Sequence, residues 1–87
     1  MNPATAEAKT AIRQKVIEIA RMLGNDARGL KDSDVIPETG LLDSAGIMEL
    51  IMWYEGKWDL SIGQEDLTIE NFGTIDAMAA YLQQAGK

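Results

Sequence analysis

The 87-residue chain contains no cysteine and no histidine, and its eight basic and fourteen acidic side chains give a net charge of −6. This composition excludes disulfide bonds, Cys/His zinc sites, cysteine nucleophiles and Ser-His-Asp triads. A chain of this length forms one small domain, so residues 1–87 are treated as a single domain.

The acidic side chains are concentrated in the middle of the chain. Residues 1–31 hold six basic and three acidic side chains, a net of +3, whereas residues 32–76 hold eleven acidic side chains and one lysine, a net of −10. The acidic stretch is either a solubilising surface or a face that meets basic partners. An acidic protein repels nucleic acid and anionic membranes, so neither is expected as a partner.

The apolar runs are too short to span a membrane, and the first residues lack the order of a secretory signal. We therefore expect a cytoplasmic protein. A first helix is predicted over about residues 4–23, between a cap at Asn2 and a stop at Gly24. Its apolar residues share one helical face, namely Ile12, Val16, Ile19, Ala20 and Leu23.

Residues 24–43 lack periodicity but are too apolar for a free linker, since they include Leu30, Val35, Ile36, Leu41 and Leu42. Long loops of this kind in compact domains are usually functional. We predict an ordered loop that crosses the bundle and delivers residues 40–44 to the start of the next helix.

A second helix is predicted over residues 44–58, with inward-facing side chains at Ile47, Leu50, Ile51, Tyr54 and Trp58. A third begins after the N-cap Thr74, continues through Leu82 and ends at Gly86. Between them, residues 64–70 are expected to form a short helix with Leu67 and Ile69 facing inward. No segment alternates as a strand would, so the predicted fold class is all-α, a small four-helix bundle of three main helices and one short helix.

Three segments match known functional motifs only in part, and in each of them a residue or feature that the motif requires is missing. Residues 32–34 begin like a calcium loop, but Ile36 and Pro37 stand where a ligand and the turn glycine are needed. Residues 36–40 approximate a sortase signal without the hydrophobic span and basic tail, and they are expected to form a turn. Residues 44–46 end like a nucleophile elbow, but no histidine exists to activate Ser44. Hydrolysis is thereby excluded, and no catalytic residue or metal site is predicted.

Ser44 remains as a hydroxyl at the predicted start of a helix, directly after Asp43. Such a serine can simply be the helix cap. It can also be a modification site, because the free N–H groups and dipole of a helix N-terminus favour an attached phosphate. The local pattern alone leaves both interpretations open.

The middle of the chain contains the run Gly40-Leu41-Leu42-Asp43-Ser44-x-Gly46-x-x-Glu49-Leu50. In an acidic helical domain, this run resembles the attachment motif of acyl carrier proteins, and the likeness covers nearly the whole chain. The resemblance implies that Ser44 carries 4′-phosphopantetheine, which comes from coenzyme A, and that Asp43 assists the transferase and its metal. The cofactor arm would hold an acyl or aminoacyl group as a thioester, which explains how a carrier works without cysteine.

Carriers of fatty-acid synthesis usually read Asp-Ser-Leu-Asp, whereas this chain has Ala45 and Gly46 after Ser44. Leu-Leu-Asp-Ser-x-Gly is more similar to D-alanyl carriers and other stand-alone carriers. The resemblance therefore implies a specialised lipid or secondary-metabolite pathway rather than bulk fatty-acid synthesis.

The second helix is expected to be the recognition element. With its apolar side inward, four residues point toward the flanking or outer surface and are predicted to bind partners: Met48, Glu49, Met52 and Glu55. Met48 and Met52 could instead belong to the edge of the core. Trp53 and Trp58 are interpreted as packing residues rather than as a cargo pocket.

The partners implied are a phosphopantetheinyl transferase, an acyl- or aminoacyl-activating ligase, and downstream transferases or synthases with basic docking surfaces. The carrier itself is expected to be a monomer. The alternative is an unmodified acidic helical module that binds a basic partner.

Overall fold

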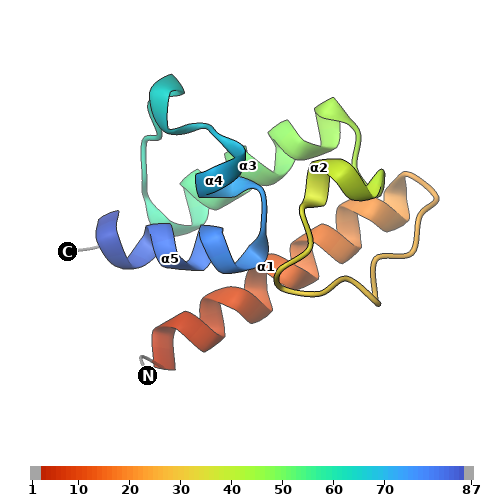
Figure 1. Cartoon of the computed structure of the whole chain (residues 1–87), viewed down its shortest axis with the longest axis horizontal. Helices are drawn as coiled ribbons and strands as arrows, with labels where there is room; N and C mark the ends of the chain where they lie inside the picture. The colour runs from red at the N-terminus through yellow and green to blue at the C-terminus, as the bar shows by residue number, and fades with distance from the viewer. Residues whose placement is uncertain (1–2, 86–87) are drawn as a thin grey trace.

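The computed structural model describes residues 3–85, and every regular element in that range is helical. Three long helices, α1 (Pro3–Met22), α3 (Ser44–Trp58) and α5 (Ile75–Ala85), are joined by segments that contain α2 (Ile36–Thr39), the 3₁₀ turn η1 (Gln64–Asp66) and α4 (Ile69–Phe72). In Figure 1, α1 runs along the lower side of the molecule with α3 and α5 above it. The all-α prediction is confirmed. Within residues 3–85, no helix combines the length and hydropathy that a membrane span requires.

The three long helices lie where the sequence predicts them. α3 has the predicted bounds, and α1 is displaced by one residue from the predicted range. α5 begins after Thr74, whose Oγ1 accepts a hydrogen bond from the Ala77 amide at 2.9 Å, as expected for an N-cap. The expected cap at Asn2 and the expected stop at Gly86 lie outside the described residues.

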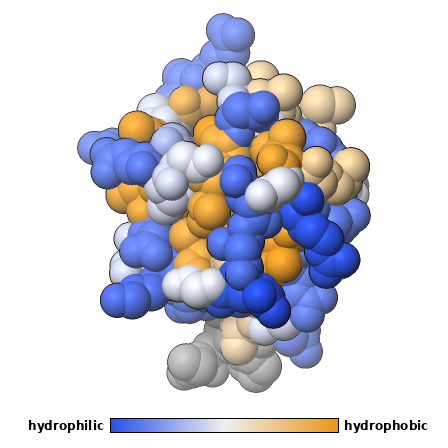
Figure 2. All heavy atoms as spheres, turned by 90° about the vertical axis from the view of Figure 1, so that its right-hand side faces the viewer, coloured by the Kyte–Doolittle hydropathy of each residue, from blue (hydrophilic) through white to orange (hydrophobic). Residues whose placement is uncertain are grey.

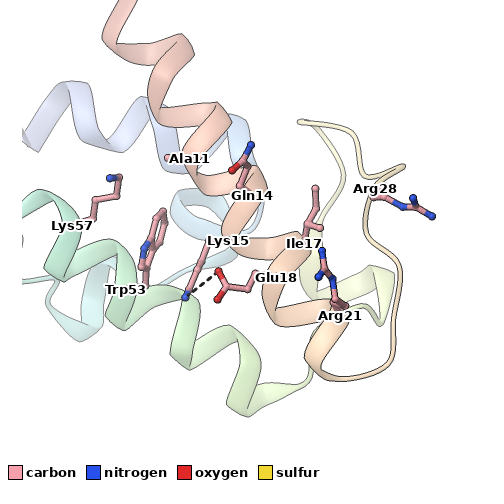
Figure 3. A pocket seen from close by; sticks show the side chains of 9 residues that line it. All are labelled: Ala11, Gln14, Lys15, Ile17, Glu18, Arg21, Arg28, Trp53 and Lys57. Atoms are coloured by element: carbon pink, nitrogen blue, oxygen red, sulfur yellow. Dashed lines mark ion pairs between the residues drawn. The ribbon is translucent and has the colours of Figure 1, made fainter.

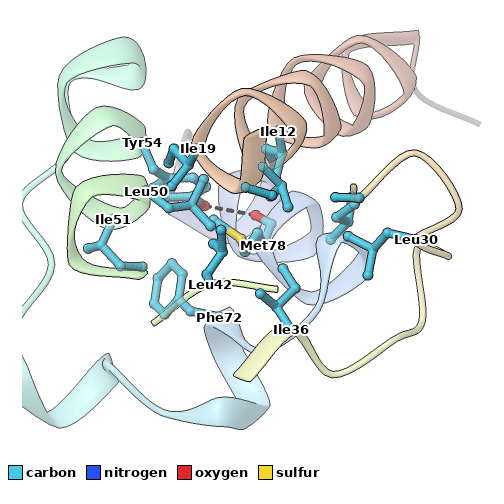
Figure 4. Packing of buried hydrophobic residues seen from close by; sticks show 14 residues of the cluster. Ile12, Ile19, Leu30, Ile36, Leu42, Leu50, Ile51, Tyr54, Phe72 and Met78 are labelled. Carbon is cyan, nitrogen blue, oxygen red and sulfur yellow. Dashed lines mark hydrogen bonds between the residues drawn. The ribbon is translucent and has the colours of Figure 1, made fainter. Parts of the chain in front are cut away.

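One hydrophobic core joins the long helices. The hydroxyl of the fully buried Tyr54, on α3, donates to the carbonyl of Met78, on α5, at 2.7 Å (Figure 4). Burial raises the pKa of Tyr54, so the phenol stays protonated and remains a donor. The predicted face of α1 is buried at Ile12, Val16, Ile19 and Ala20. Leu23, predicted on the same face, instead lies beyond the end of α1 and is 43% exposed.

The segment between α1 and α2 is an ordered loop, as predicted. The Arg13 guanidinium on α1 donates to the Leu30 carbonyl and to Asp32 Oδ1. The Asp76 amide at the start of α5 donates to the Asp32 carbonyl at 3.1 Å. Within the loop, the side chains of Ala27 and Leu30 are buried in the core, so both backbone and side-chain contacts fix its path.

Two short helices differ from the predictions. Residues 36–39 form α2 rather than a turn, because a proline near the first helical position is compatible with a helix start and Gly40, at φ 75°, ends the helix in the left-handed region. Residues 64–70 do not form one helix: η1 ends at Asp66, and Thr68 caps the separate helix α4 through a 3.2 Å bond from the Asn71 amide.

The side chains of that region are also placed differently. Leu67 and Ile69, predicted to face inward, are 38% and 57% exposed, and Phe72 is the buried residue instead. Phe72 packs edge-on against Tyr54 with ring centroids 5.4 Å apart. Ile69 and Phe72 are three residues apart and lie on the same side of α4, with Ile69 at its exposed start and Phe72 at its buried end.

Candidate functional site

Ser44 is the first residue of α3 and is not its cap. The N-cap is Asp43, whose Oδ1 accepts a hydrogen bond from the Gly46 amide at 2.7 Å. The side chain of Ser44 is exposed, and no hydrogen bond to its hydroxyl is found among the described residues. The capping interpretation of Ser44 is therefore wrong, and its hydroxyl is accessible for chemistry.

The chain that leads to Ser44 is held on both sides. Thr39 Oγ1 donates to the Ile36 carbonyl at 2.7 Å and accepts from the Leu41 amide at 3.2 Å. The Leu41 carbonyl accepts from Asn25 Nδ2, beyond the end of α1, at 2.9 Å. Leu42 is buried in the core. These contacts fix the direction in which the chain enters α3.

The start of α3 also packs closely against the end of α1. Gly46 is buried, and a Cβ atom at this position would lie 3.2 Å from Ile19 Cγ2 and 3.3 Å from Leu23 Cδ1. A side chain as large as aspartate would not fit without displacing α1. This contact gives a structural reason for the glycine at the position where carriers of fatty-acid synthesis usually have an acid.

An apolar groove opens beside Ser44, between α3 and α4. Its volume is about 290 Å³, close to the lower limit of small-ligand pockets. The groove is lined mainly by hydrophobic side chains: Pro37, Ile47, Met48, Ile51, Leu67, Ile69 and Phe72. Leu67 and Ile69 form part of its wall. Ser44 also lines this groove, so its hydroxyl oxygen lies directly beside an apolar surface.

Sequence reasoning missed Pro37 and Phe72 as groove residues. The usable signal was Thr68, a good N-cap residue directly before Ile69. It would have started the short helix at Ile69 and placed Phe72, three residues later, on the same side of that helix as Ile69.

The four predicted partner-binding residues are placed unequally. Met48 and Met52 are 54% and 63% exposed on successive turns of α3, and Glu49 beside them is exposed. The two methionines therefore do not belong to the core. Glu55 is only partly exposed, and its Oε2 accepts a hydrogen bond from the Ile62 amide at 2.9 Å. Glu55 thus supports the chain that follows α3.

The side of the molecule where α1 ends exposes apolar residues among hydrophilic ones (Figure 2). Met22 is 72% exposed there. Trp53 and Trp58, predicted as packing residues, do not line the groove beside Ser44. Both pack against the core, and their rings meet edge-on with centroids 5.5 Å apart.

Comparison with known proteins gives one informative match. The sequence matches no protein-family model, and no solved structure is significantly similar. The chain is 38% identical over 79 residues to an acyl carrier protein from Bdellovibrio bacteriovorus, a match that covers 88% of this chain and 97% of that protein. Identity at this level over nearly both full lengths shows that the chain belongs to the acyl carrier protein family, whose members are carriers and not enzymes.

Proposed function

We propose that Ser44 carries 4′-phosphopantetheine and that the protein presents an acyl or aminoacyl group to biosynthetic enzymes. The observation that carries the proposal is the exposed Ser44 hydroxyl, free of hydrogen bonds within the described residues, at the first position of the 15-residue helix α3. When bound, the cofactor supplies the thiol that holds the cargo as a thioester.

The residues around Ser44 fit this group. A phosphodiester on Ser44 would lie at the positive end of the α3 dipole, near the unpaired N–H groups of the first turn. The apolar groove beside Ser44 can accept a hydrophobic part of the cargo, because its lining is mainly hydrophobic. The protein's own contribution is to fix the attachment oxygen and keep it exposed.

Asp43 is proposed to assist the transferase and its metal. Its Oδ1 caps α3, and its Oδ2 has no partner among the described residues. The side chain is exposed directly beside Ser44. One carboxylate can therefore stabilise the helix through one oxygen and offer the other to a metal ion held by an enzyme.

Intact-mass measurement after incubation with coenzyme A and a broad-specificity phosphopantetheinyl transferase tests the attachment site. The wild-type protein is expected to gain the mass of one phosphopantetheinyl group, and Ser44→Ala is expected to gain none. Ser33→Ala and Ser61→Ala, which change the other two serines of the chain, should react as the wild type does. If the wild type gains no mass while a known carrier reacts in the same mixture, the unmodified interaction module becomes the better explanation.

The exposed residues Met48, Glu49 and Met52 are proposed to dock basic enzyme surfaces, with Glu55 at the edge of this surface. Exposed methionines adapt to different partners, and a carboxylate steers basic ones. The partly exposed Glu55 also makes the bond to Ile62, so a change there would mix docking with stability.

Glu49→Lys provides the cleaner test of docking. We expect this variant to lower kcat/KM for modification by the transferase about tenfold, mainly through slower association. Glu7→Lys is the control variant, because it makes the same change in net charge at an exposed position of α1. It should alter kcat/KM for modification by less than about twofold. Equal rates for the two variants would remove Glu49 from the docking surface.

A specialised pathway, rather than bulk fatty-acid synthesis, is the proposed setting. Its support is the Ala45-Gly46 pair, in which the buried glycine replaces a second acidic side chain. The proposed cellular location is the cytoplasm, where coenzyme A and the activating enzymes occur. Thioester mass spectrometry of protein purified from its native host would identify the cargo, and a bulk fatty-acid intermediate there would contradict the pathway proposal.

A further inference from the structure

A second hollow lies between α1 and α3, away from the groove beside Ser44. Its volume is about 590 Å³, and four basic side chains line it: Lys15, Arg21, Arg28 and Lys57. Glu18 is the single acidic residue among the lining side chains. In Figure 3, Trp53 stands on α3 between Lys57 and Lys15.

The basic character of this hollow contrasts with the net charge of −6 of the protein as a whole. The cations Lys9 and Arg13 lie elsewhere on α1 and pair with Asp76 and Asp32. The four cations of the hollow come from α1, the loop after it and α3, and they form a local group that is separate from the paired cations Lys9 and Arg13.

Two of these four cations are only partly neutralised. Lys15 pairs with Glu18 at 3.6 Å, and Arg28 pairs with Asp26 at 2.9 Å. The hydrogen bonds from Arg28 lower the pKa of Asp26, so Asp26 is ionised at neutral pH. The Arg28 side chain is 80% exposed and its guanidinium remains accessible to a further acceptor, whereas the Lys15 side chain is only 19% exposed.

The other two cations have no acidic partner among the described residues. Arg21 is exposed at the last turn of α1, and Lys57 lies 5.6 Å from the centre of the Trp58 ring. They stand on different helices at separate places around the hollow, as Figure 3 shows. An acidic ligand that reaches both would need more than one carboxylate, which favours an extended segment.

The lining of the hollow is partly apolar. It includes the half-buried Trp53 on α3 and Ile17 on α1. A tryptophan ring beside cations is a favourable surface for a segment that has carboxylates around an apolar side chain. Long polyanions are disfavoured, because nucleic acid or an anionic bilayer would also meet the acidic remainder of the molecule.

We propose that this basic hollow docks an acidic, solvent-exposed segment of a partner protein. Lys57 and Ser44 lie near opposite ends of α3, about 20 Å apart along the helix axis. If Ser44 is modified as proposed above, a partner held in the hollow would leave the attachment site open to a second enzyme. The docking itself does not depend on that modification.

The test is an NMR titration of the unmodified, ¹⁵N-labelled protein with a capped peptide of glutamates around one central phenylalanine. Amide shifts are expected at residues that line the hollow, and they should be lost at high salt. A peptide with glutamine in place of every glutamate is the control ligand and should cause no saturable shifts. Absence of saturable shifts with the acidic peptide, or shifts confined to other surfaces, would overturn the proposal.

A matched pair of charge reversals locates the site. Arg21→Glu is expected to weaken binding of the acidic peptide at least about tenfold, whereas Lys31→Glu, with the same change in net charge at an exposed site outside the hollow, should weaken it less than about twofold. If both variants bound the acidic peptide equally weakly, the loss would come from the overall charge of the protein and the proposal would be overturned. Ser44→Ala should bind like the wild type, so the outcome is separate from that of the attachment experiment. Concentration-dependent shifts in the hollow without peptide would assign it to a second copy of the chain instead.

Discussion

Tyr54→Ala is expected to lower the free energy of unfolding by about 3–5 kcal/mol, the usual cost of deleting a buried aromatic side chain. The side chain is fully buried, and it contacts the rings of Trp58 and Phe72 edge-on, with centroid distances of 5.2 and 5.4 Å. Because small domains have only about 5–15 kcal/mol of stability, this change removes a large part of it. Urea unfolding followed by far-UV circular dichroism measures the loss.

Tyr54→Phe separates the ring from its hydroxyl. This variant keeps the aromatic contacts and loses only the hydrogen bond to the Met78 carbonyl, so a loss of about 1 kcal/mol is expected. If Tyr54→Ala proved no less stable than Tyr54→Phe, the ring would not be the link between α3, α4 and α5 that its contacts indicate.

Gly73→Ala is expected to lower the free energy of unfolding by about 1–3 kcal/mol through overpacking at the end of α4. A Cβ atom at this buried position would lie 2.5 Å from the Ile69 carbonyl oxygen, which is backbone and cannot rotate away. The Gly73 carbonyl also accepts from the Ile36 amide at 2.7 Å, so displacing it would disturb α2. The midpoint of urea unfolding should fall accordingly.

Gly56→Ala is the matched control for Gly73→Ala. Gly56 lies within α3, is exposed, and has no atom within 4 Å of a would-be Cβ. The same substitution should therefore stabilise the protein, by about 0.5–1 kcal/mol, because alanine favours the helix. A shift of the same sign in both variants would show that helix propensity and not crowding controls position 73.

Long helices with a regular apolar face were predictable from sequence. The predicted bounds of α3 rest on the helical spacing of inward positions such as Leu50 and Tyr54. Periodicity was sufficient because one face of each long helix is buried over several turns. It failed at Leu23, where the pattern continues past the last helical residue.

The short helices depend on contacts that a local pattern does not contain. α2 and α4 each span only four residues, so neither has a full period to detect. The bond from the Ile36 amide to the Gly73 carbonyl joins two positions far apart in sequence. Such a contact becomes visible only once the long helices have been packed together.

The site was predictable in part. The position of Ser44 at the start of α3 followed from the sequence, whereas the choice between Ser44 and Asp43 as the cap needed the bond to the Gly46 amide. The basic hollow escaped prediction, because its cations come from α1, the following loop and α3. The basic excess of residues 1–31 was visible, but Lys57 lies far outside that range.

The grouping of four basic side chains around one hollow of an acidic protein distributes charge unevenly, so the molecule has an electric dipole as well as a net charge. A torque acts on such a dipole in the field of a charged enzyme, so the carrier can rotate before contact is made. If basic enzymes dock at Glu49 as proposed, such a rotation would turn that part of α3 toward the enzyme during approach and shorten the orientational search that usually limits association. The order of charges along the chain thus influences how often an encounter begins in a productive orientation.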